Sequence, residues 1–476
     1  MKKVAFRNLG CKVNEYELEY MQQKMSENGY EIVPFDTKAD IYVVNTCTVT
    51  NIADRKSRQM LHKAKKENPD AIVVAVGCYV QTDTKGAGND AAVDIAIGNN
   101  HKAEIATIIA EYITKNAGEC RRGNNDTDAS GECRRDNNDI SVSTKCSQDI
   151  ATSAECSRNK NIKVSDLTTP VPYENMHITR TSEHTRAFMK IQDGCNQFCS
   201  YCAIPLARGR IRSRKLNDIL EEASALANNG YHEVVLTGIH LSSYGLDFHG
   251  ENYNIVAKEQ GYTNEDLLNV IEKVAKIPGI SRIRLGSLEP RLITEEFLSR
   301  LSKVEAICPH FHLSLQSGCD ETLKRMNRKY TTAEFKHAVE LLRTYFDNPA
   351  VTTDVIVGFP GETDEEFEIT YNFLKEIKFF EMHVFKYSRR RNTVADKLPN
   401  QVSDRDKDIR SDRLLELDEE LSAQFRNSYI GKEVEVLFEE LKDGRWVGHT
   451  KEYILCSVGD SGEALGGVIK KITYKM

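Results

Sequence analysis

The chain has 476 residues, 13 cysteines and a formal net charge of −7, and 40% of its residues are hydrophobic. This size predicts two to four domains with apolar cores, and no window approaches the roughly 18 apolar residues that a membrane span requires. The charged start is unlike an export signal, so we expect a cytoplasmic protein whose cysteines serve metal or redox chemistry instead of disulfides.

Residues 1–112 alternate patterns of strand and helix. The runs follow the order strand 4–9, helix 14–29, strand 41–45, helix 55–68 and strand 71–76. This order predicts a mostly parallel sheet covered by helices. In such sheets, ligands gather beyond the carboxyl ends of the strands.

A cysteine follows each of these three predicted strands, namely Cys11, Cys47 and Cys78. Parallel strands would bring the three thiols to one rim of the sheet, where they could hold a metal cluster. The alternative is that they are small core residues, because free cysteine is commonly buried. Equivalent placement at three strand ends favours the cluster.

Residues 113–180 differ from what precedes them, and we expect a disordered insert or linker. Segment 118–130 is followed at once by the similar segment 131–143, and both are polar. Such a unit is too short and polar to bury an apolar face, which excludes a solenoid. Its cysteines, Cys120, Cys133, Cys146 and Cys156, are interpreted as copied with the repeat or incidental to it; metal binding is the alternative.

From residue 181 the alternation of strand and helix resumes. Strands are predicted at 187–192, 233–238, 281–287, 310–317, 352–359 and 382–388. Six strand–helix repeats predict an α/β fold, a partial (βα)6 barrel over residues 181–411 with its site at the carboxyl ends of the strands.

Residues 412–476 are expected to form a separate C-terminal domain. A charged amphipathic helix is predicted from about 404 to 429, and short alternating runs with Gly and Asp turns follow it. These runs predict a small β-barrel, a shape that often grips single-stranded RNA.

The strongest motif is Cys195, Cys199 and Cys202 in DGCNQFCSYCAIP, on the loop after the first barrel strand. Three thiolates at this spacing can hold three irons of a 4Fe–4S cluster. The fourth iron is then free to bind the amino and carboxylate groups of S-adenosylmethionine (SAM). A structural zinc site is the alternative, but zinc prefers four protein ligands and no fourth Cys or His lies nearby.

The chain resembles the radical SAM methylthiotransferases over nearly its whole length. The blocks that carry the resemblance are LGCKVNEYE, VVNTCTVT, VGCYVQ, DGCNQFCSYCAIPLARGRIRSR, LTGIHLSSYG, GSLEP, HLSLQSG and GFPGET. The resemblance implies an N-terminal cluster domain, a radical SAM barrel and a C-terminal β-barrel called TRAM. It also implies two 4Fe–4S clusters and SAM as cofactors.

The family attaches a methylthio group to an unactivated carbon. LGCKVNEYE and TGIHLSSYG resemble the branch that acts on C2 of N6-threonylcarbamoyladenosine in tRNA, 3′-adjacent to the anticodon. The other branches act on isopentenyl-adenosine in tRNA or on a ribosomal protein. A non-catalytic iron–sulfur or zinc RNA-binding protein is a further alternative. We expect a monomer, with tRNA and an electron donor such as a flavodoxin or ferredoxin as partners.

Residues at the barrel strand ends are expected to contact SAM. They are Tyr201, Thr237, Gly238, Ser287, Glu289, Gly358, Pro360 and Gly361. Basic residues of the same loops could bind the SAM carboxylate, RNA phosphate or the threonylcarbamoyl carboxylate, and they are Arg208, Arg210 and Arg212, with His240. Two further basic runs, Arg55 to Arg58 and Lys386 to Arg391, are candidates for phosphate contacts.

Overall fold

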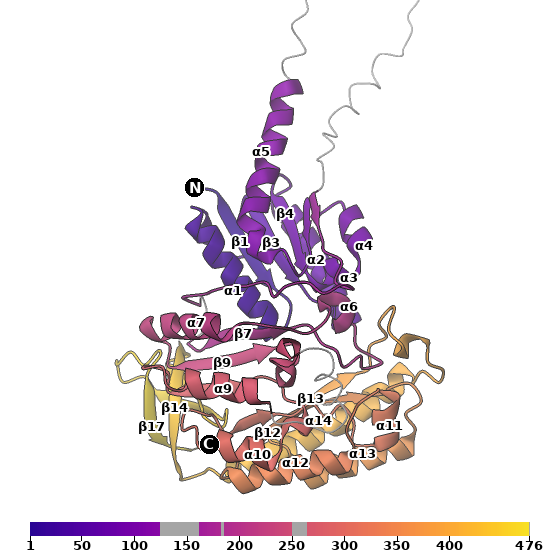
Figure 1. Cartoon of the computed structure of the whole chain (residues 1–476), viewed down its shortest axis with the longest axis vertical. Helices are drawn as coiled ribbons and strands as arrows, with labels where there is room; N and C mark the ends of the chain where they lie inside the picture. Colours follow the sequence, from indigo (N-terminus) through magenta and orange to yellow (C-terminus); the bar gives the residue numbers. More distant parts are fainter. Residues whose placement is uncertain (124–160, 182–184, 250–263, 476) are drawn as a thin grey trace, which may run out of the picture.

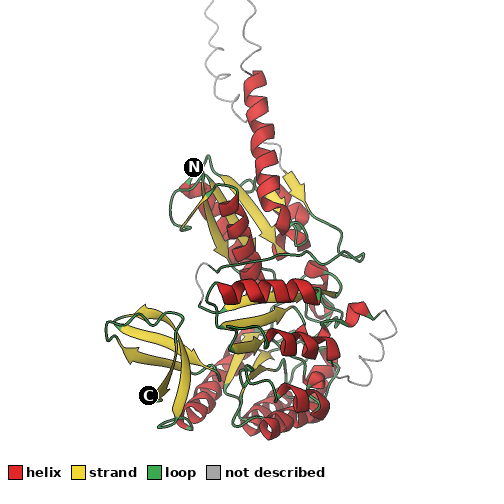
Figure 2. Cartoon of the chain, turned by 60° about the vertical axis from the view of Figure 1, so that its left-hand side comes forward, coloured by secondary structure: helices red, strands yellow, loops and turns green. Residues whose placement is uncertain are grey.

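The computed structural model describes residues 1–123, 161–181, 185–249 and 264–475. Figure 1 shows the N-terminal α/β part above the barrel, and the C-terminal sheet at one side of the barrel. Figure 2, in which the view is turned, shows the same three parts. Among the described helices, none is both long and apolar enough to cross a membrane.

The N-terminal sheet has six parallel strands in the order β2-β1-β3-β4-β5-β6. The strands are β1 (Lys3–Asn8), β2 (Glu31–Val33), β3 (Ile41–Thr46), β4 (Ile72–Gly77), β5 (Ile95–Ile97) and β6 (Asn161–Lys163). Apolar residues of α1 (Lys12–Glu27) and α5 (Ile105–Gly123) pack on one face. The other face packs against α2 (Asn51–Glu67), α3 (Cys78–Thr82) and α4 (Thr84–Asn89). The predicted parallel, helix-covered sheet is confirmed.

The bounds expected for the insert, 113–180, are too wide. Helix α5 continues to Gly123, and β6 pairs with β5 as the edge strand of the sheet. Met176 and Ile178 are buried in the barrel core. These stretches were missed because a three-residue strand has no detectable period. The repeats beyond Gly123, with Cys133, Cys146 and Cys156, lie outside the described residues, and Cys120 falls within the last part of α5.

The barrel has the six parallel strands that the sequence predicts. They are β7 (Ala187–Asp193), β9 (Glu233–Gly238), β10 (Arg282–Leu285), β11 (His310–His312), β12 (Ala350–Val357) and β13 (Glu381–Lys386). A short β8 (Arg212–Ser213) runs antiparallel to β7. A parallel bridge between Leu288 and Leu313 joins the β7-β9-β10 group to the β11-β12-β13 group. The α/β fold class is therefore confirmed.

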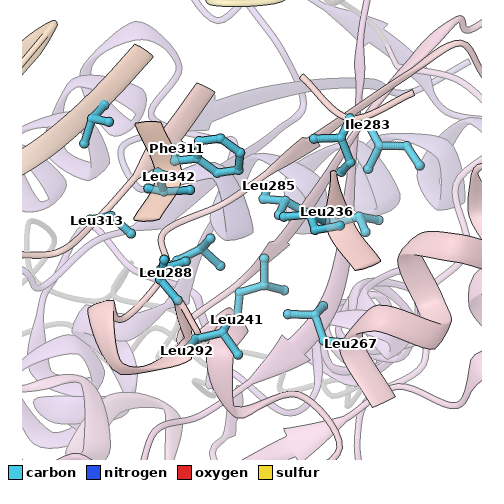
Figure 3. Close-up of a cluster of buried hydrophobic side chains, with 14 of the residues drawn as sticks. Leu236, Leu241, Leu267, Ile283, Leu285, Leu288, Leu292, Phe311, Leu313 and Leu342 are labelled. Carbon is cyan, nitrogen blue, oxygen red and sulfur yellow. The ribbon is translucent and has the colours of Figure 1, made fainter. Parts of the chain in front are cut away.

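Helices surround the barrel strands. They are α6 (Ile204–Arg208), α7 (Leu216–Asn228), α9 (Glu265–Val274), α10 (Glu295–Leu301), α11 (Asp320–Arg325), α12 (Thr332–Tyr345) and α13 (Asp364–Ile377). Figure 3 shows the core between strands and helices, with Leu236, Ile283, Leu285, Phe311 and Leu313 among its side chains. Side chains alternate between the two faces of a strand. The strand residues that alternate with these apolar ones therefore face the barrel interior.

That interior is polar. Its side chains include Arg282 and Arg284 of β10, His310 and His312 of β11, and Asp354 of β12. A parallel sheet buried on both faces ordinarily carries apolar residues on both. The polar side chains of this interior have partners within the protein, such as Glu233 for Arg284 and Thr352 for His312.

The last barrel helix, α14 (Asp404–Asn427), crosses the domain boundary expected at residue 412. Its Leu414, Leu417 and Leu421 belong to the barrel core, so α14 belongs to the barrel. The C-terminal part begins at β14 instead. It is an antiparallel sheet in the order β16-β15-β14-β17, comprising β14 (Glu433–Lys442), β15 (Arg445–Thr450), β16 (Leu455–Gly459) and β17 (Ile469–Thr473).

The loop between β15 and β16 carries Tyr453 to the barrel interior. The Tyr453 ring stacks on His310, with 5.2 Å between ring centroids. The guanidinium carbons of Arg186 and Arg284 lie 4.9 and 4.8 Å from the Tyr453 ring centroid. The backbone of Tyr453 has φ +72°, which is uncommon for a residue with a side chain. The C-terminal sheet thus packs against the polar side chains of the barrel interior.

Candidate functional site

A cavity of 320 Å³ lies at the carboxyl ends of the barrel strands, and Cys195, Cys199 and Cys202 line it together. The chain enters this loop through Gly194, whose φ is +71°. A side chain at Gly194 would collide with the carbonyl oxygen of Arg210, so glycine is required at this turn.

Each of the three sulfurs in this cavity has a hydrogen-bond donor. The Gln197 N–H lies 3.4 Å from Cys195 Sγ, and Arg328 Nη1 lies 3.3 Å from Cys199 Sγ. The Ile204 N–H donates to Cys202. Burial raises the pKa of Cys195 to about 12, whereas these donors favour the thiolate, the form that binds iron.

The N-terminal cysteines also meet at one rim of their sheet. Burial, followed by the neighbouring thiol of Cys78 and, more weakly, that of Cys11, raises the pKa of Cys47 to about 12. Cys47 Sγ accepts from the Val49 N–H at 3.5 Å, and Cys78 Sγ accepts from Asn99 Nδ2 at 3.4 Å. Cys11 is exposed. The strand ends thus bring three thiols into one neighbourhood.

The spacing of both cysteine sets fits a cluster better than a single ion. One zinc with Zn–S bonds of about 2.3 Å holds its sulfurs roughly 3.8 Å apart. Within the described part of the chain, the only His, Cys, Asp or Glu trio with ligand atoms all within 4.8 Å of one another is His312, Asp354 and His383. Neither cysteine set is that compact, as expected for thiolates that bind different irons.

The N-terminal part also contributes to this cavity. Val49 and Thr50, which follow Cys47, line it together with Cys195, Cys199 and Cys202. The segment that carries Cys47 therefore reaches the cavity of the barrel cysteines, although Cys11, Cys47 and Cys78 are not among its lining residues.

The residues expected to contact SAM divide into two groups. Tyr201, Ser287 and Glu289 line the cavity. Glu289 accepts from Gln197 Nε2 at 3.1 Å and lies 3.4 Å from His240 Nε2.

The other expected SAM contacts do not line the cavity, and they are Thr237, Gly238, Gly358, Pro360 and Gly361. Gly238 packs against Gln192, whose Oε1 would lie 2.8 Å from an added Cβ. The Gly358 N–H donates to Glu362 Oε1 at 2.9 Å, and Arg410 of α14 holds the same carboxylate. Gly238 and Gly358 thus have packing and turn contacts of their own, and the SAM contacts of this group remain a prediction.

Several cavity residues were not singled out from the sequence. They are Ser314, Arg328, Asp354, Ile356, Phe385 and Tyr387. Arg328 follows α11 in a segment with no distinguishing motif, and its contact with Cys199 depends on the tertiary fold. Gln316, left without a role, has φ +73° at the cavity wall, and such strain often accompanies a functional site.

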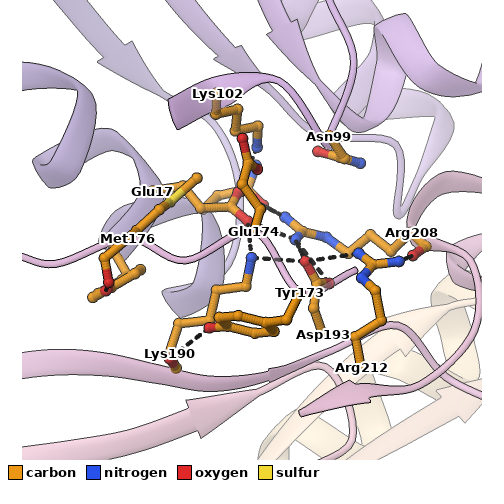
Figure 4. A network of polar contacts seen from close by, with 12 residues as sticks. Glu17, Asn99, Lys102, Tyr173, Glu174, Met176, Lys190, Asp193, Arg208 and Arg212 are labelled. Atoms are coloured by element: carbon orange, nitrogen blue, oxygen red, sulfur yellow. Dashed lines mark hydrogen bonds and ion pairs between the residues drawn. The ribbon is translucent and has the colours of Figure 1, made fainter. Parts of the chain in front are cut away.

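A buried ionic network joins the N-terminal part to the barrel (Figure 4). Arg208 contacts both carboxylate oxygens of Glu17, at 2.8 and 3.0 Å, and Asp193 at 3.2 Å. Lys190 lies 2.7 Å from each of the two acids, and Lys102 also pairs with Glu17. Burial alone would raise the pKa of Glu17, but these cations hold it well below its usual range.

Two of the three arginines that were expected to bind a ligand are instead engaged in this network. Arg208 is completely buried, and Arg212 pairs with Asp193 at 3.2 Å. Their charges are already compensated inside the protein. Arg210 remains exposed, with its guanidinium 4.5 Å from the Phe198 ring centroid. The predicted role as ligand contacts is therefore wrong for Arg208 and Arg212.

The two other basic runs come together at a second cavity, of 860 Å³. Arg58 of α2 and Arg389 to Arg391 of the loop after β13 line it. Arg389 and Arg390 pair with Asp396 and Asp54, whereas Arg391 is exposed. Arginines more than 300 positions apart thus line one cavity, together with Asp54, Asp83 and Asp396.

Two family models match the chain. The radical SAM superfamily matches residues 189–374, and uncharacterized protein family UPF0004 matches residues 3–98. The solved structure of the radical S-adenosylmethionine methyltransferase TsrM from Kitasatospora setae has a TM-score of 0.52 over 81% of this chain and 75% of that chain. It is 17% identical, so this likeness concerns the fold alone.

Characterised relatives match nearly the full length. The threonylcarbamoyladenosine tRNA methylthiotransferase MtaB of Bacillus subtilis is 36% identical over 99% of this chain and 93% of its own length. MtaB of Aquifex aeolicus is 37% identical over 92% of this chain and 93% of its own. The tRNA-2-methylthio-N(6)-dimethylallyladenosine synthase of Alkaliphilus oremlandii is 30% identical over 98% and 89%.

Proposed function

Because the chain belongs to the radical SAM tRNA methylthiotransferases, we propose that it methylthiolates C2 of N6-threonylcarbamoyladenosine, 3′-adjacent to the anticodon of tRNA. Relatives named for this substrate share 36% and 37% identity with it. The relative from Alkaliphilus oremlandii that is named for dimethylallyladenosine shares 30%. Dimethylallyladenosine is the competing substrate.

The observation that carries the proposal is the cavity that Cys195, Cys199 and Cys202 line together with Val49 and Thr50, which follow Cys47. Enzymes of this family carry two 4Fe–4S clusters and use SAM. In our proposal, Cys195, Cys199 and Cys202 hold the cluster whose open iron binds SAM. Cys11, Cys47 and Cys78, which meet at the rim of the N-terminal sheet, hold the second cluster.

The chain's own residues position the reactants. Arg328 and the Gln197 N–H orient the barrel thiolates, and Tyr201, Ser287 and Glu289 would contact SAM from the two loops that follow β7 and β10. Adenine C2 is inert to acids and bases, and bound SAM supplies the radical chemistry that no side chain offers. Apolar lining by Ile239, Leu288, Ile356 and Phe385 limits water around that chemistry.

The basic cavity around Arg58 and Arg391 would bind phosphates of the tRNA beside the target nucleotide. The target base must leave its stack to reach the cavity, because its C2 is otherwise covered. A protein such as a flavodoxin or ferredoxin would deliver the electron to the barrel cluster.

Two otherwise matched tRNAs test the substrate. One carries threonylcarbamoyl at N6 of the target adenosine, and the other carries isopentenyl. We expect nucleoside mass spectrometry to detect the methylthio product with the first. Product from the isopentenyl tRNA alone would contradict the substrate assignment and leave the radical chemistry intact.

A further inference from the structure

The inner face of β11, β12 and β13 carries two histidines and one carboxylate that belong to neither cysteine set. They are His312, Asp354 and His383, one from each strand. His312 lies opposite Thr352 in the parallel pair β11-β12, and Asp354 lies opposite His383 in the parallel pair β12-β13. Because residues two apart on a strand share a face, this register puts all three side chains on the same face of the sheet.

The three side chains are close enough to share one ion. One ligand atom of each lies within 4.8 Å of the other two. His312 Nε2 and Asp354 Oδ2 are 3.4 Å apart, which is close to the roughly 3.3 Å between two ligands of a tetrahedral zinc ion. The His383 ring stacks beside the His312 ring, with 5.7 Å between the ring centroids. His383 is exposed, so a small turn of its side chain would close the trio around one ion.

Thr352 orients the His312 ring. Its hydroxyl lies 3.0 Å from His312 Nδ1, the ring nitrogen that does not face Asp354. An imidazole that donates its Nδ1–H to an oxygen keeps the lone pair of Nε2 for a metal, and most metal-binding histidines have such an outer partner. The peptide of Asp354 is held by the Gln316 N–H, which donates to its carbonyl oxygen at 2.8 Å. Neighbouring residues therefore set the positions of two of the three ligands.

An ordinary hydrogen bond between His312 and Asp354 is the alternative interpretation. That bond accounts for two of the residues and gives no part to His383, whose ring lies against that of His312. No other group of His, Cys, Asp and Glu in the described part of the chain is as compact, the two cysteine sets included. The arrangement of all three residues is therefore better explained by a shared ion.

We propose that His312, Asp354 and His383 bind one divalent transition-metal ion, separate from both iron–sulfur clusters. Two imidazoles and one carboxylate suit Zn²⁺, Fe²⁺ or Ni²⁺, whereas Mg²⁺ and Ca²⁺ prefer oxygen ligands. Three protein ligands leave a coordination position open, and water would occupy it. Asp354 also lines the cavity of the barrel cysteines, so the ion would lie at the wall of that cavity. The site does not depend on which nucleoside the enzyme modifies.

Zinc binding to the enzyme with both clusters loaded tests this site. Loosely held metal is first removed with EDTA, and the protein is then dialysed anaerobically against micromolar Zn²⁺. We expect the wild type to bind one zinc per chain at unchanged iron content. Thr352→Val removes the outer partner of His312 and should weaken binding by about 10- to 100-fold. His383→Ala removes a ligand and should weaken it more than that. His337→Ala, which changes an exposed histidine of α12, is the control and should bind as the wild type does.

X-ray absorption at the zinc edge identifies the ligands, because iron absorbs at a different energy. Nitrogen and oxygen neighbours at about 2.0–2.2 Å would support the site, whereas sulfur neighbours at about 2.3 Å would place the zinc on cysteines and overturn the proposal. A wild type that binds no zinc would also overturn it. So would full zinc affinity in His383→Ala, provided that its melting temperature and iron content show an intact fold.

Discussion

The guanidinium of Arg208 lies 2.8 Å from the carboxylate of Glu17, and both side chains are completely inaccessible to solvent. Arg208 follows the barrel cysteines and Glu17 lies on α1, 191 positions earlier. This pair connects the loop that holds one cysteine set to the helix that begins beside the other.

Arg208→Met should destabilise the protein by about 3–5 kcal/mol, because it leaves buried acids without a partner. Arg300→Met is the control. Arg300 pairs with Glu265 and Glu272 at the surface, and its loss should cost below about 1 kcal/mol. Denaturant titration of both variants measures the difference. Equal effects would show that burial of the Arg208 pair has no energetic consequence.

Replacing Cys195, Cys199 and Cys202 by alanine should remove about half of roughly eight irons and all cleavage of SAM. The reason is that these thiols line the cavity together. Cys319→Ala is a matched control, since Cys319 is a buried barrel cysteine outside that cavity. Iron analysis and detection of 5′-deoxyadenosine are the measurements. Persistent SAM cleavage in the triple variant would contradict the assignment.

Alanine at Cys11, Cys47 and Cys78 should leave SAM cleavage detectable and abolish methylthio insertion. Radical generation requires the barrel site, whereas sulfur transfer requires both. Product analysis by mass spectrometry, beside the 5′-deoxyadenosine assay, separates the two steps. If both activities disappear from a variant with half the iron and a wild-type melting temperature, the roles are not divided in this way.

Glu174 should make stability depend on pH. Burial raises its pKa from 4.5 to about 7, while its Oε1 accepts from the Ala103 N–H. The unfolded chain therefore ionises Glu174 first as pH rises, and stability falls between pH 4.5 and about 7. Glu174→Gln keeps the acceptor without the charge and should be more stable at pH 8 by up to about 3 kcal/mol. Calorimetry at pH 5 and pH 8 should show the gain mainly at the higher pH; an equal gain at both would exclude this cause.

Arg58→Glu with Arg391→Glu should weaken tRNA binding and reduce its salt dependence. Each lost phosphate contact lowers the slope of log K against log salt by about 0.7 to 0.9. Lys38→Glu carries a like charge change away from this cavity and should have little effect. Titrations at several salt concentrations give the slopes. An unchanged slope in the double variant would remove the basic cavity from the tRNA site.

The long elements could be predicted from the sequence because their periodicity extends over many residues. Five of the six barrel strands and the helices α1 and α7 follow such patterns, whereas the three-residue β11 was predicted as part of the longer run 310–317. Strands β2, β5 and β6 have three residues each, and pairing with a neighbour decides whether so short a segment is a strand.

The cysteines of the site could be predicted for a related reason. A residue directly after a parallel strand has its position fixed by the strand, whatever its partners are. Charged residues are different. Arg208 and Arg210 look equally available in the sequence, and only contacts over long separations pair the first with Glu17 and leave the second exposed.

The ring of Tyr453 makes the C-terminal sheet inseparable from the barrel. A chain that ended after α14 would lose the ring between Arg186 and Arg284 and expose the polar side chains that it covers. Exchange of C-terminal sheets between relatives would therefore alter the packing of the barrel interior as well. The two parts are expected to have been inherited as one unit, with the loop after β15 matched to the arginines it meets.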